Sequence, residues 1–191
     1  MPNNSQQQNP ATETPEDPLN PKCRYEEATD DVYDLINHAI NTLPEFSSLV
    51  NVKIMAIFDL KKKLTKGQLR LAEVKLTNDM TRYLTIDFME DRPEGYDVIM
   101  VIDKLAWQLT YKMDPDQTNT IAGITGHEYR RRLVRHELRH IMLDVDANKA
   151  RILPHDVEDF MAEVKLNTLK PDWAVTLAES AISYYEAMKG V

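Results

Sequence analysis

The sequence predicts an α+β domain in which a small β-sheet packs with helices, because three kinds of pattern follow one another along the chain. Residues 24–43 carry apolar side chains at helical spacing. Two β-branched, apolar runs, residues 52–60 and 96–103, have the composition of buried strands. Helical patterns return after residue 104, and no internal repeat interrupts the order. A chain of 191 residues, 42% of them hydrophobic, can bury one sizeable core.

The first twenty residues differ in composition from the rest of the chain. Residues 1–20 are rich in Pro, Asn, Gln and Thr and contain no aromatic side chain. They cannot bury enough apolar surface to offset the entropy lost on ordering, so we expect a disordered tail. A docking segment for a partner is the alternative. The predicted organisation is therefore a tail, residues 1–20, and one domain, residues 21–191.

The first half of the domain alternates helix and strand patterns. The helix predicted from Arg24 to Leu43 ends at Pro44, which cannot continue it. Residues 69–76 are ambiguous, because their first half alternates like a strand and their second half suits a helix that follows. Residues 96–103 are apolar on both faces, which is typical of a fully buried strand. The remaining predicted elements are a turn at 61–68, a turn at 92–95 and a short helix at 104–113.

The second half of the domain is predicted to be helical. Thr125 and Glu128 have the spacing of a capping box, so a helix should run from Gly126 to about Asp144. After a loop at 145–154, a further helix is expected from 156 to 167. Pro171 is well placed in the first turn of a last helix. The apolar stripe of that last helix would be Trp173, Leu177, Ala181, Tyr184, Tyr185 and Met188.

The whole-chain composition limits the classes of function. The net charge of −8 argues against a general nucleic-acid binder, which normally carries a basic surface. Cys23 is the only cysteine, so we expect no internal disulfide, a reducing compartment and no cysteine-based metal site. The N-terminus lacks the pattern of a signal peptide, and no stretch is long and apolar enough to span a membrane. We therefore expect a soluble, cytoplasmic protein, of unknown oligomeric state.

The stretch "VRHELRHIMLD", residues 134–144, contains His-Glu-x-x-His, formed by His136, Glu137 and His140. Residues four apart lie one above the other on a helix, so both imidazoles can converge on one zinc ion. Glu137 is rotated by about 100° from its neighbour, so it should reach a water at the metal rather than the ion itself. A carboxylate in that position can take a proton and later deliver it to a leaving amine. The alternative is an ordinary charged helix.

A catalytic zinc ion needs a third protein ligand. His155 follows His140 across a loop that is long enough to turn the chain back, so we predict His155 as that ligand. Three carboxylates are alternatives: Asp144, Glu158 and Glu163.

Other polar residues receive lesser roles. Asp156 and Asp159 are candidates for orienting a ligand histidine through its second ring nitrogen. His127 lies roughly 13 Å before His136 along the helix axis, which is too far for one ion. His38, on the first helix, has no feature that places it at the site. The arginines of the basic run are expected to form a solvated face rather than a polyanion site: Arg130, Arg131, Arg132, Arg135 and Arg139.

The chain resembles the putative phage metallopeptidases of bacteriophages and prophages. The stretches that carry the resemblance are "DVIMVIDKLAWQL", "RRLVRHELRHI" and "LPHDVEDFMAEVKLN", within residues 50–185. The resemblance implies a zincin-like metalloprotease domain, with His136, His140 and His155 on zinc and Glu137 as general base.

Such a zincin-like enzyme would act on a protein or peptide in the cytoplasm of the host cell. In zincin-like proteases a sheet edge takes the substrate as an added strand, and residues 97–102 are either that edge or a central strand. Two other functions stay open: a non-catalytic zinc-binding interaction or regulatory protein, and a protease restricted to one repressor or DNA-bound protein.

Overall fold

The computed structural model describes residues 23–65, 68–87, 94–112, 124–144, 149–155, 166–167 and 172–189. The predicted tail and almost all of the helix predicted at 156–167 lie outside these residues. Over the described chain, the secondary structure is that of the predicted α+β class, with a small mixed sheet and helices. None of the helices in these ranges is long and apolar enough to cross a membrane.

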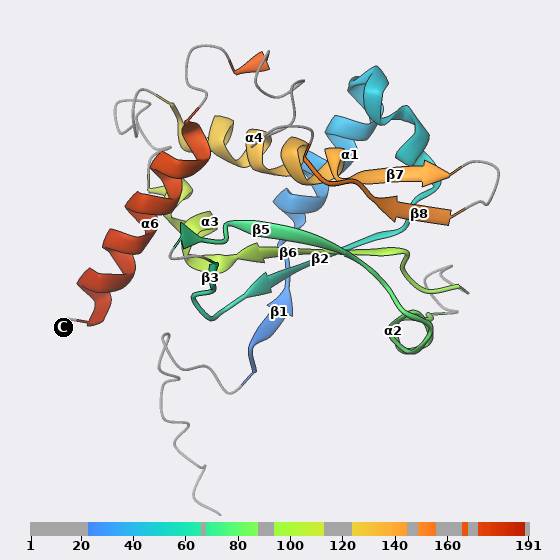
Figure 1. Cartoon of the computed structure of the whole chain (residues 1–191), viewed down its shortest axis with the longest axis horizontal. Helices are drawn as coiled ribbons and strands as arrows, with labels where there is room; N and C mark the ends of the chain where they lie inside the picture. Colours follow the sequence, from blue (N-terminus) through green and yellow to red (C-terminus); the bar gives the residue numbers. More distant parts are fainter. Residues whose placement is uncertain are drawn as a thin grey trace, which may run out of the picture.

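A four-stranded sheet forms the centre of the molecule (Figure 1). Its strands lie in the order β1 (Tyr25–Glu27), β2 (Ile54–Asp59), β6 (Val98–Asp103) and β5 (Ala72–Leu76). β2 and β6 are parallel, and the two outer pairings are antiparallel. The strands predicted at 52–60 and 96–103 are confirmed. β6 is a central strand, so the edge next to it is β5.

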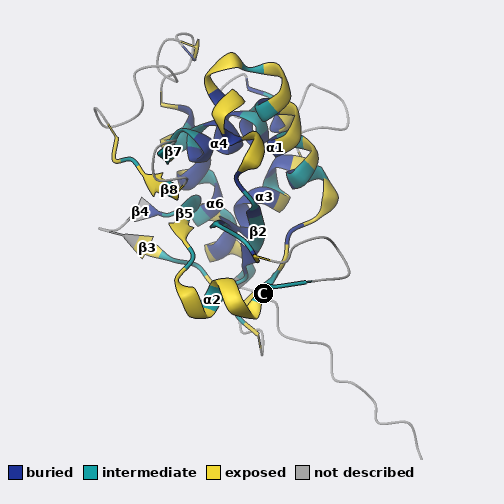
Figure 2. Ribbon diagram, turned by 90° about the vertical axis from the view of Figure 1, so that its right-hand side faces the viewer, coloured by how far each residue is buried: buried dark blue, intermediate teal, exposed yellow. Residues whose placement is uncertain are grey.

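Helices cover one face of this sheet (Figure 1): α1 (Asp30–Thr42), α3 (Lys104–Tyr111) and α4 (Gly126–Arg139). The largest fully buried side chains include Trp107 of α3, Tyr129 and Leu138 of α4, and Met100 of β6. Figure 2 shows the buried parts of the ribbon in the interior, whereas the short helix α2 (Asp79–Leu84) is largely exposed. The core therefore lies between the sheet and the helices, and α4 is part of it.

The last helix, α6 (Trp173–Lys189), lies at one end of the sheet and contacts α3, α4 and the short strand β4 (Gln68–Leu69). Its predicted apolar stripe is confirmed. Trp173, Leu177, Ala181 and Tyr185 are buried, and Tyr184 and Met188 are partly buried against the core. α6 thus forms a wall beside α4 rather than an appendage.

The beginning of the domain differs from the prediction. The helix predicted from Arg24 begins at Asp30, and Tyr25–Glu27 instead forms β1, which pairs with β2. Pairing with an open sheet edge satisfies backbone groups that a helical first turn would leave without partners. The turn predicted at 61–68 contains β3 (Leu64–Thr65), which pairs with β4. A 3₁₀ helix, η1 (Pro44–Asn51), connects α1 to β2.

The end of α4 was also predicted wrongly. Thr125 caps α4 as expected, since its hydroxyl accepts from the Glu128 backbone N–H at 3.3 Å. However, α4 ends at Arg139 instead of about Asp144. Residues 141–144 form β7 (Ile141–Asp144), which pairs with β8 (Lys149–Ile152) inside the segment expected to be a loop. The ladder between these strands replaces the helical hydrogen bonds of the last turn.

Candidate metal centre

Three histidines meet where α4 ends. His136 lies in the last full turn of the helix, His140 is its C-cap, and His155 follows β8. One ring nitrogen of each lies within 4.8 Å of the others. The Nε2 atoms of His136 and His155 are 3.0 Å apart. The structure thus brings together the three residues predicted as ligands, although 19 positions separate the first from the last.

The β7–β8 hairpin explains how His155 reaches the helix. It reverses the chain directly after His140, and Leu153 then returns beside that residue. The Leu153 N–H donates to the His140 carbonyl oxygen at 2.7 Å. The Nδ1 of His140 lies 2.7 Å from the Leu153 carbonyl oxygen, which can only accept, so this nitrogen carries the proton. The lone pair of His140 is therefore on Nε2, as a metal ligand needs.

The donor set fits a zinc ion. Two imidazole nitrogens on one tetrahedral zinc ion lie about 3.3 Å apart, given bonds of about 2.0–2.1 Å. The spacing of 3.0 Å between His136 and His155 is close to this value. His155 is exposed and the other two histidines are half-buried, so the centre is open to solvent on one side. Three histidines with an open side are the ligand arrangement of a catalytic rather than a structural zinc.

Glu137 lies beside the histidines and is almost completely buried, with 4% of its surface exposed. Its Oε2 atom has no hydrogen-bond partner among the residues that the structure describes. Burial raises the pKa of Glu137 to about 7, whereas the positive charge of His136 acts to lower it. A divalent cation held by the histidines would likewise favour the charged form. A buried carboxylate without a partner destabilises the fold, so the arrangement suits a chemical role.

A cleft of about 690 Å³ runs over the three histidines and Glu137. One wall is the segment 152–155, and the other is the edge strand β5 with the residue pair Arg70 and Glu73. Among the described strands, β5 pairs only with β6, so the opposite edge of its backbone faces this cleft. The cleft therefore combines the candidate centre with an open strand edge.

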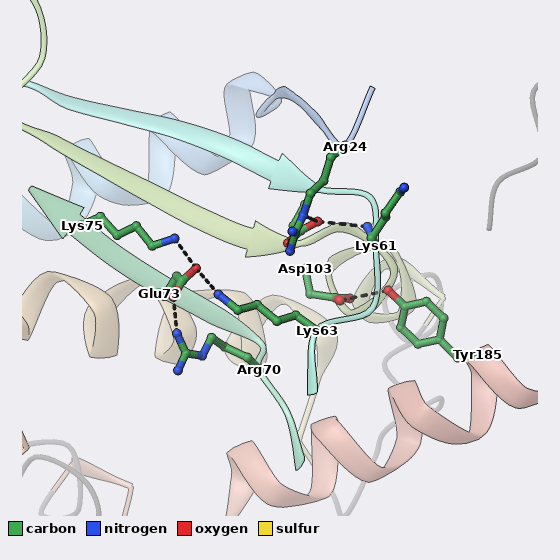
Figure 3. A network of polar contacts seen from close by, with 9 residues as sticks. Arg24, Lys61, Lys63, Arg70, Glu73, Lys75, Asp103 and Tyr185 are labelled. Carbon is green, nitrogen blue, oxygen red and sulfur yellow. Dashed lines mark hydrogen bonds and ion pairs between the residues drawn. The ribbon is translucent and has the colours of Figure 1, made fainter. Parts of the chain in front are cut away.

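Glu73 is the second carboxylate of the cleft, and three cations surround it (Figure 3). Lys63 and Lys75 lie 2.7 and 2.6 Å from its Oε1 atom, and Arg70 pairs with Oε2. These ion pairs hold the pKa of Glu73 at about 2, although partial burial alone would raise it. The sequence contained no motif at Arg70 or Glu73, and their place in the cleft depends on the sheet order.

The alternative ligands fare differently. Asp144 lies on β7, not one helical turn after His140, and it forms an ion pair with Arg151. Glu158 and Glu163, and also the proposed orienting residues Asp156 and Asp159, lie outside the described residues. His38 and His127 are exposed and do not join the histidine cluster.

The prediction of a solvated arginine face is wrong for four of the five arginines, and only Arg131, with a side chain that is 39% exposed, fits it. Arg130, Arg132 and Arg135 are buried, and the Arg139 side chain is only 7% exposed. Their heads bind within the fold: Arg130 donates to the Thr110 hydroxyl at 2.9 Å and stacks over Tyr111, Arg132 pairs with Glu128, and Arg139 pairs with Glu45. Arginine stems pack as apolar surface once the guanidinium has a partner, and helical spacing alone does not show which partners will be present.

A His-Glu-x-x-His helix with a third histidine nearby defines a candidate metal-dependent hydrolase centre. Residues 124–181 match the family model described as putative phage metallopeptidase, which confirms the resemblance predicted from the sequence. The match contains all three histidines and Glu137, and the family description indicates a metal-dependent peptidase. No curated protein and no solved structure matches the chain. The zincin-like character of the fold therefore stays a prediction.

Proposed function

We propose that this protein is a zinc-dependent peptidase in which His136, His140 and His155 hold the metal and Glu137 is the general base. The observation that carries the proposal is the meeting of three histidine nitrogens beside a buried glutamate with a free oxygen. When bound, zinc would supply Lewis acidity, which makes water more acidic near neutral pH and stabilises negative charge on oxygen. The substrate would be a protein or peptide in the cytoplasm of the phage host.

Glu137 would move the proton. Glu137 lines the cleft, so its carboxylate can accept a proton from the attacking water. The same carboxyl can then donate the proton to the amine that leaves when the peptide bond breaks. The burial of this side chain limits its contact with other waters.

The edge strand β5 would bind the peptide. An extended substrate that pairs with the open edge of β5 lies in the cleft between this strand and the segment 152–155. Such pairing presents the peptide backbone to the histidines without requiring a particular sequence along most of its length. This assigns the substrate edge to residues 72–76, and the alternative at 97–102 is ruled out because β6 is interior.

The experiment compares purified wild type with Glu137→Gln, which keeps the shape of the side chain and removes the base. Each protein is incubated with host-cell extract, and new peptide termini are identified by mass spectrometry. We expect fragments with wild type that a chelator abolishes and added zinc restores, and almost none with Glu137→Gln. Glu27→Gln, an exposed position on β1, is the matched control and should behave as wild type. Identical fragments from wild type and Glu137→Gln would refute the role of Glu137.

Elemental analysis separates the proposal from a non-catalytic zinc site. Both wild type and Glu137→Gln should contain one equivalent of zinc, because Glu137 is not a ligand. A zinc-loaded wild type that yields no fragments in extract would instead favour an interaction or regulatory protein, which needs no general base.

A further inference from the structure

A second cavity, of about 410 Å³, opens beside the candidate centre. It lies between α4, α6 and the chain around the β4–β5 junction, and His136, Glu137 and His155 form one side of it. Its volume falls in the range of pockets that enclose a ligand group, about 300–1,000 Å³. Since Glu137 and two histidines line both this cavity and the cleft along β5, the two spaces meet at the centre.

The walls of the cavity away from the histidines are almost entirely apolar. They are formed by Leu69 and Leu71 of the β4–β5 region, Leu133 of α4, and Trp173, Ala178 and Ile182 of α6. Among the described residues of the lining, Glu179 and Glu137 carry the acidic side chains, and Glu179 is exposed. Apolar walls repay the burial of an apolar group and offer no partner to a polar one.

We propose that this cavity receives the side chain of the substrate residue next to the cleaved bond and selects a large aliphatic or aromatic one. The inference rests on the proposed peptidase function and adds the substrate class. A peptide held on β5 has its reacting carbonyl at the histidines, and the cavity is a half-open space beside them into which an adjoining side chain can extend. Several of the residues that would set this specificity lie on α6, which supplies no proposed ligand or base.

Two small side chains of α6 keep the cavity open. Ala174 and Ala178 both line it, and larger residues there would occupy the space of the substrate side chain. Ala178 is 8% exposed and packed in the core, whereas Ala174 is only partly buried. Ala174→Leu is therefore the variant that fills the cavity with the least disturbance of the fold. Ala187→Leu makes the same change at an exposed position of the same helix and is the matched control.

The test measures affinity rather than turnover. Zinc-loaded protein is titrated by calorimetry with peptide hydroxamates that differ in one side chain: methyl, isobutyl, benzyl or aminobutyl. The hydroxamate group anchors each probe on the metal, so differences in Kd measure how well each side chain fits the cavity. We expect the isobutyl and benzyl probes to bind at least about tenfold more tightly than the methyl probe, since discrimination of apolar groups by such pockets reaches about 10–200-fold.

The variants sharpen the test. Ala174→Leu should lose most of this preference while it still binds the methyl probe, and Ala187→Leu should match wild type. Should Ala174→Leu not fold, as judged by circular dichroism, Ile182→Ala provides a second variant: it enlarges the cavity and should shift the preference further toward benzyl.

Three outcomes would overturn a part of the scheme. Equal affinities for all probes on zinc-loaded wild type overturn the assignment of the cavity and leave the metal site intact. Tightest binding of the aminobutyl probe, lost in Glu179→Gln, assigns a cationic side chain instead of an apolar one. A wild type that binds no zinc by elemental analysis overturns the proposed function itself, and the cavity assignment falls with it.

Discussion

Glu137 and Glu73 line the same cleft, yet their surroundings are opposite. Glu137 of α4 is 4% exposed, and its Oε2 atom has no hydrogen-bond partner in the described part of the chain. Glu73 has a side chain that is 14% exposed and is paired with three cations: Lys63, which precedes β3, Lys75 of β5, and Arg70, which follows β4. Burial raises the pKa of both carboxyl groups, but the ion pairs of Glu73 reverse the result, to about 2, whereas Glu137 reaches about 7.

These environments indicate that one carboxylate stabilises the folded state and that the other destabilises it. A charged group with three partners contributes to stability and stays ionised at any physiological pH. A buried carboxyl without a partner loses its hydration and gains no compensating bond. Local conflicts of the second kind are expected at functional sites. The comparison therefore supports Glu137 as the chemical group and Glu73 as a structural one that fixes the wall of the cleft.

The largest expected effect is on catalysis. Glu137→Gln should lower the rate of peptide-bond cleavage by about 10²–10⁴-fold, because general-base catalysis contributes this much. Its free energy of unfolding should stay within about 1 kcal/mol of wild type or rise, since the amide carries no buried charge. Glu73→Gln should instead keep most of the cleavage rate and lower the free energy of unfolding. Initial rates of fragment formation and denaturant unfolding measure both quantities, and equal loss of activity in the two variants would break the comparison.

The next effect concerns the metal. His136→Ala, His140→Ala and His155→Ala should each lower zinc affinity at least about 100-fold, because even residues that only orient ligands are worth about 10–100-fold. His38→Ala and His127→Ala should bind zinc as wild type does. Competition with a chromogenic chelator provides the measurement. If His155→Ala binds zinc fully while Glu158→Ala or Glu163→Ala does not, the third ligand is a carboxylate rather than His155.

A smaller effect is expected on stability at the other carboxylate. Glu73→Gln should destabilise the fold by about 1–2 kcal/mol at pH 7, because it removes several partly exposed ion pairs worth about 0.2–1 kcal/mol each. The folded pKa of about 2 lies below the unfolded value of 4.5, so this contribution is complete above pH 4.5 and is lost as pH falls toward 2. The free energy of unfolding, measured between pH 2 and 7, should therefore depend less on pH in the variant than in wild type. An unchanged slope would show that the three cations do not stabilise the charged form.

Asp103 should give a pH dependence of the opposite sign. It lies at the end of β6, caps α3 through the Ala106 N–H at 2.8 Å, and accepts from the Tyr185 hydroxyl at 2.9 Å (Figure 3). Burial raises its pKa from 3.8 to about 6, so the folded state holds the proton more tightly and stability falls as pH rises across this range. Asp103→Asn keeps the cap and should remove this fall. If stability still falls with rising pH in the variant, the pH dependence belongs to another group.

The smallest expected effect is at the N-terminus. Deletion of residues 1–20 should change the free energy of unfolding by less than about 1 kcal/mol, since nothing in their composition can pack against the domain. Thermal unfolding of the full chain and the shortened chain measures this difference. A larger loss would mean that the segment docks on the domain, and the predicted boundary would be wrong.

Features that depend on neighbouring residues could be predicted from the sequence alone. The strands at 52–60 and 96–103, the Thr125 cap and the facing of His136 and His140 all follow from local periodicity, capping and composition. The apolar stripe of α6 belongs to the same group, because helical spacing fixes which side chains share a face. Such rules need no knowledge of what lies across the core.

The rest of the candidate site depends on tertiary contacts. The end of α4 at Arg139 and the return of His155 depend on β7 pairing with β8, a contact between segments that no local pattern links. The exposed edge of β5, the ion pairs of Glu73 and the burial of Arg130 likewise depend on the order of strands and on partners from distant residues. Backbone hydrogen bonds and ion pairs are satisfied by whichever groups the fold brings near, so their partners are fixed only once the chain has folded.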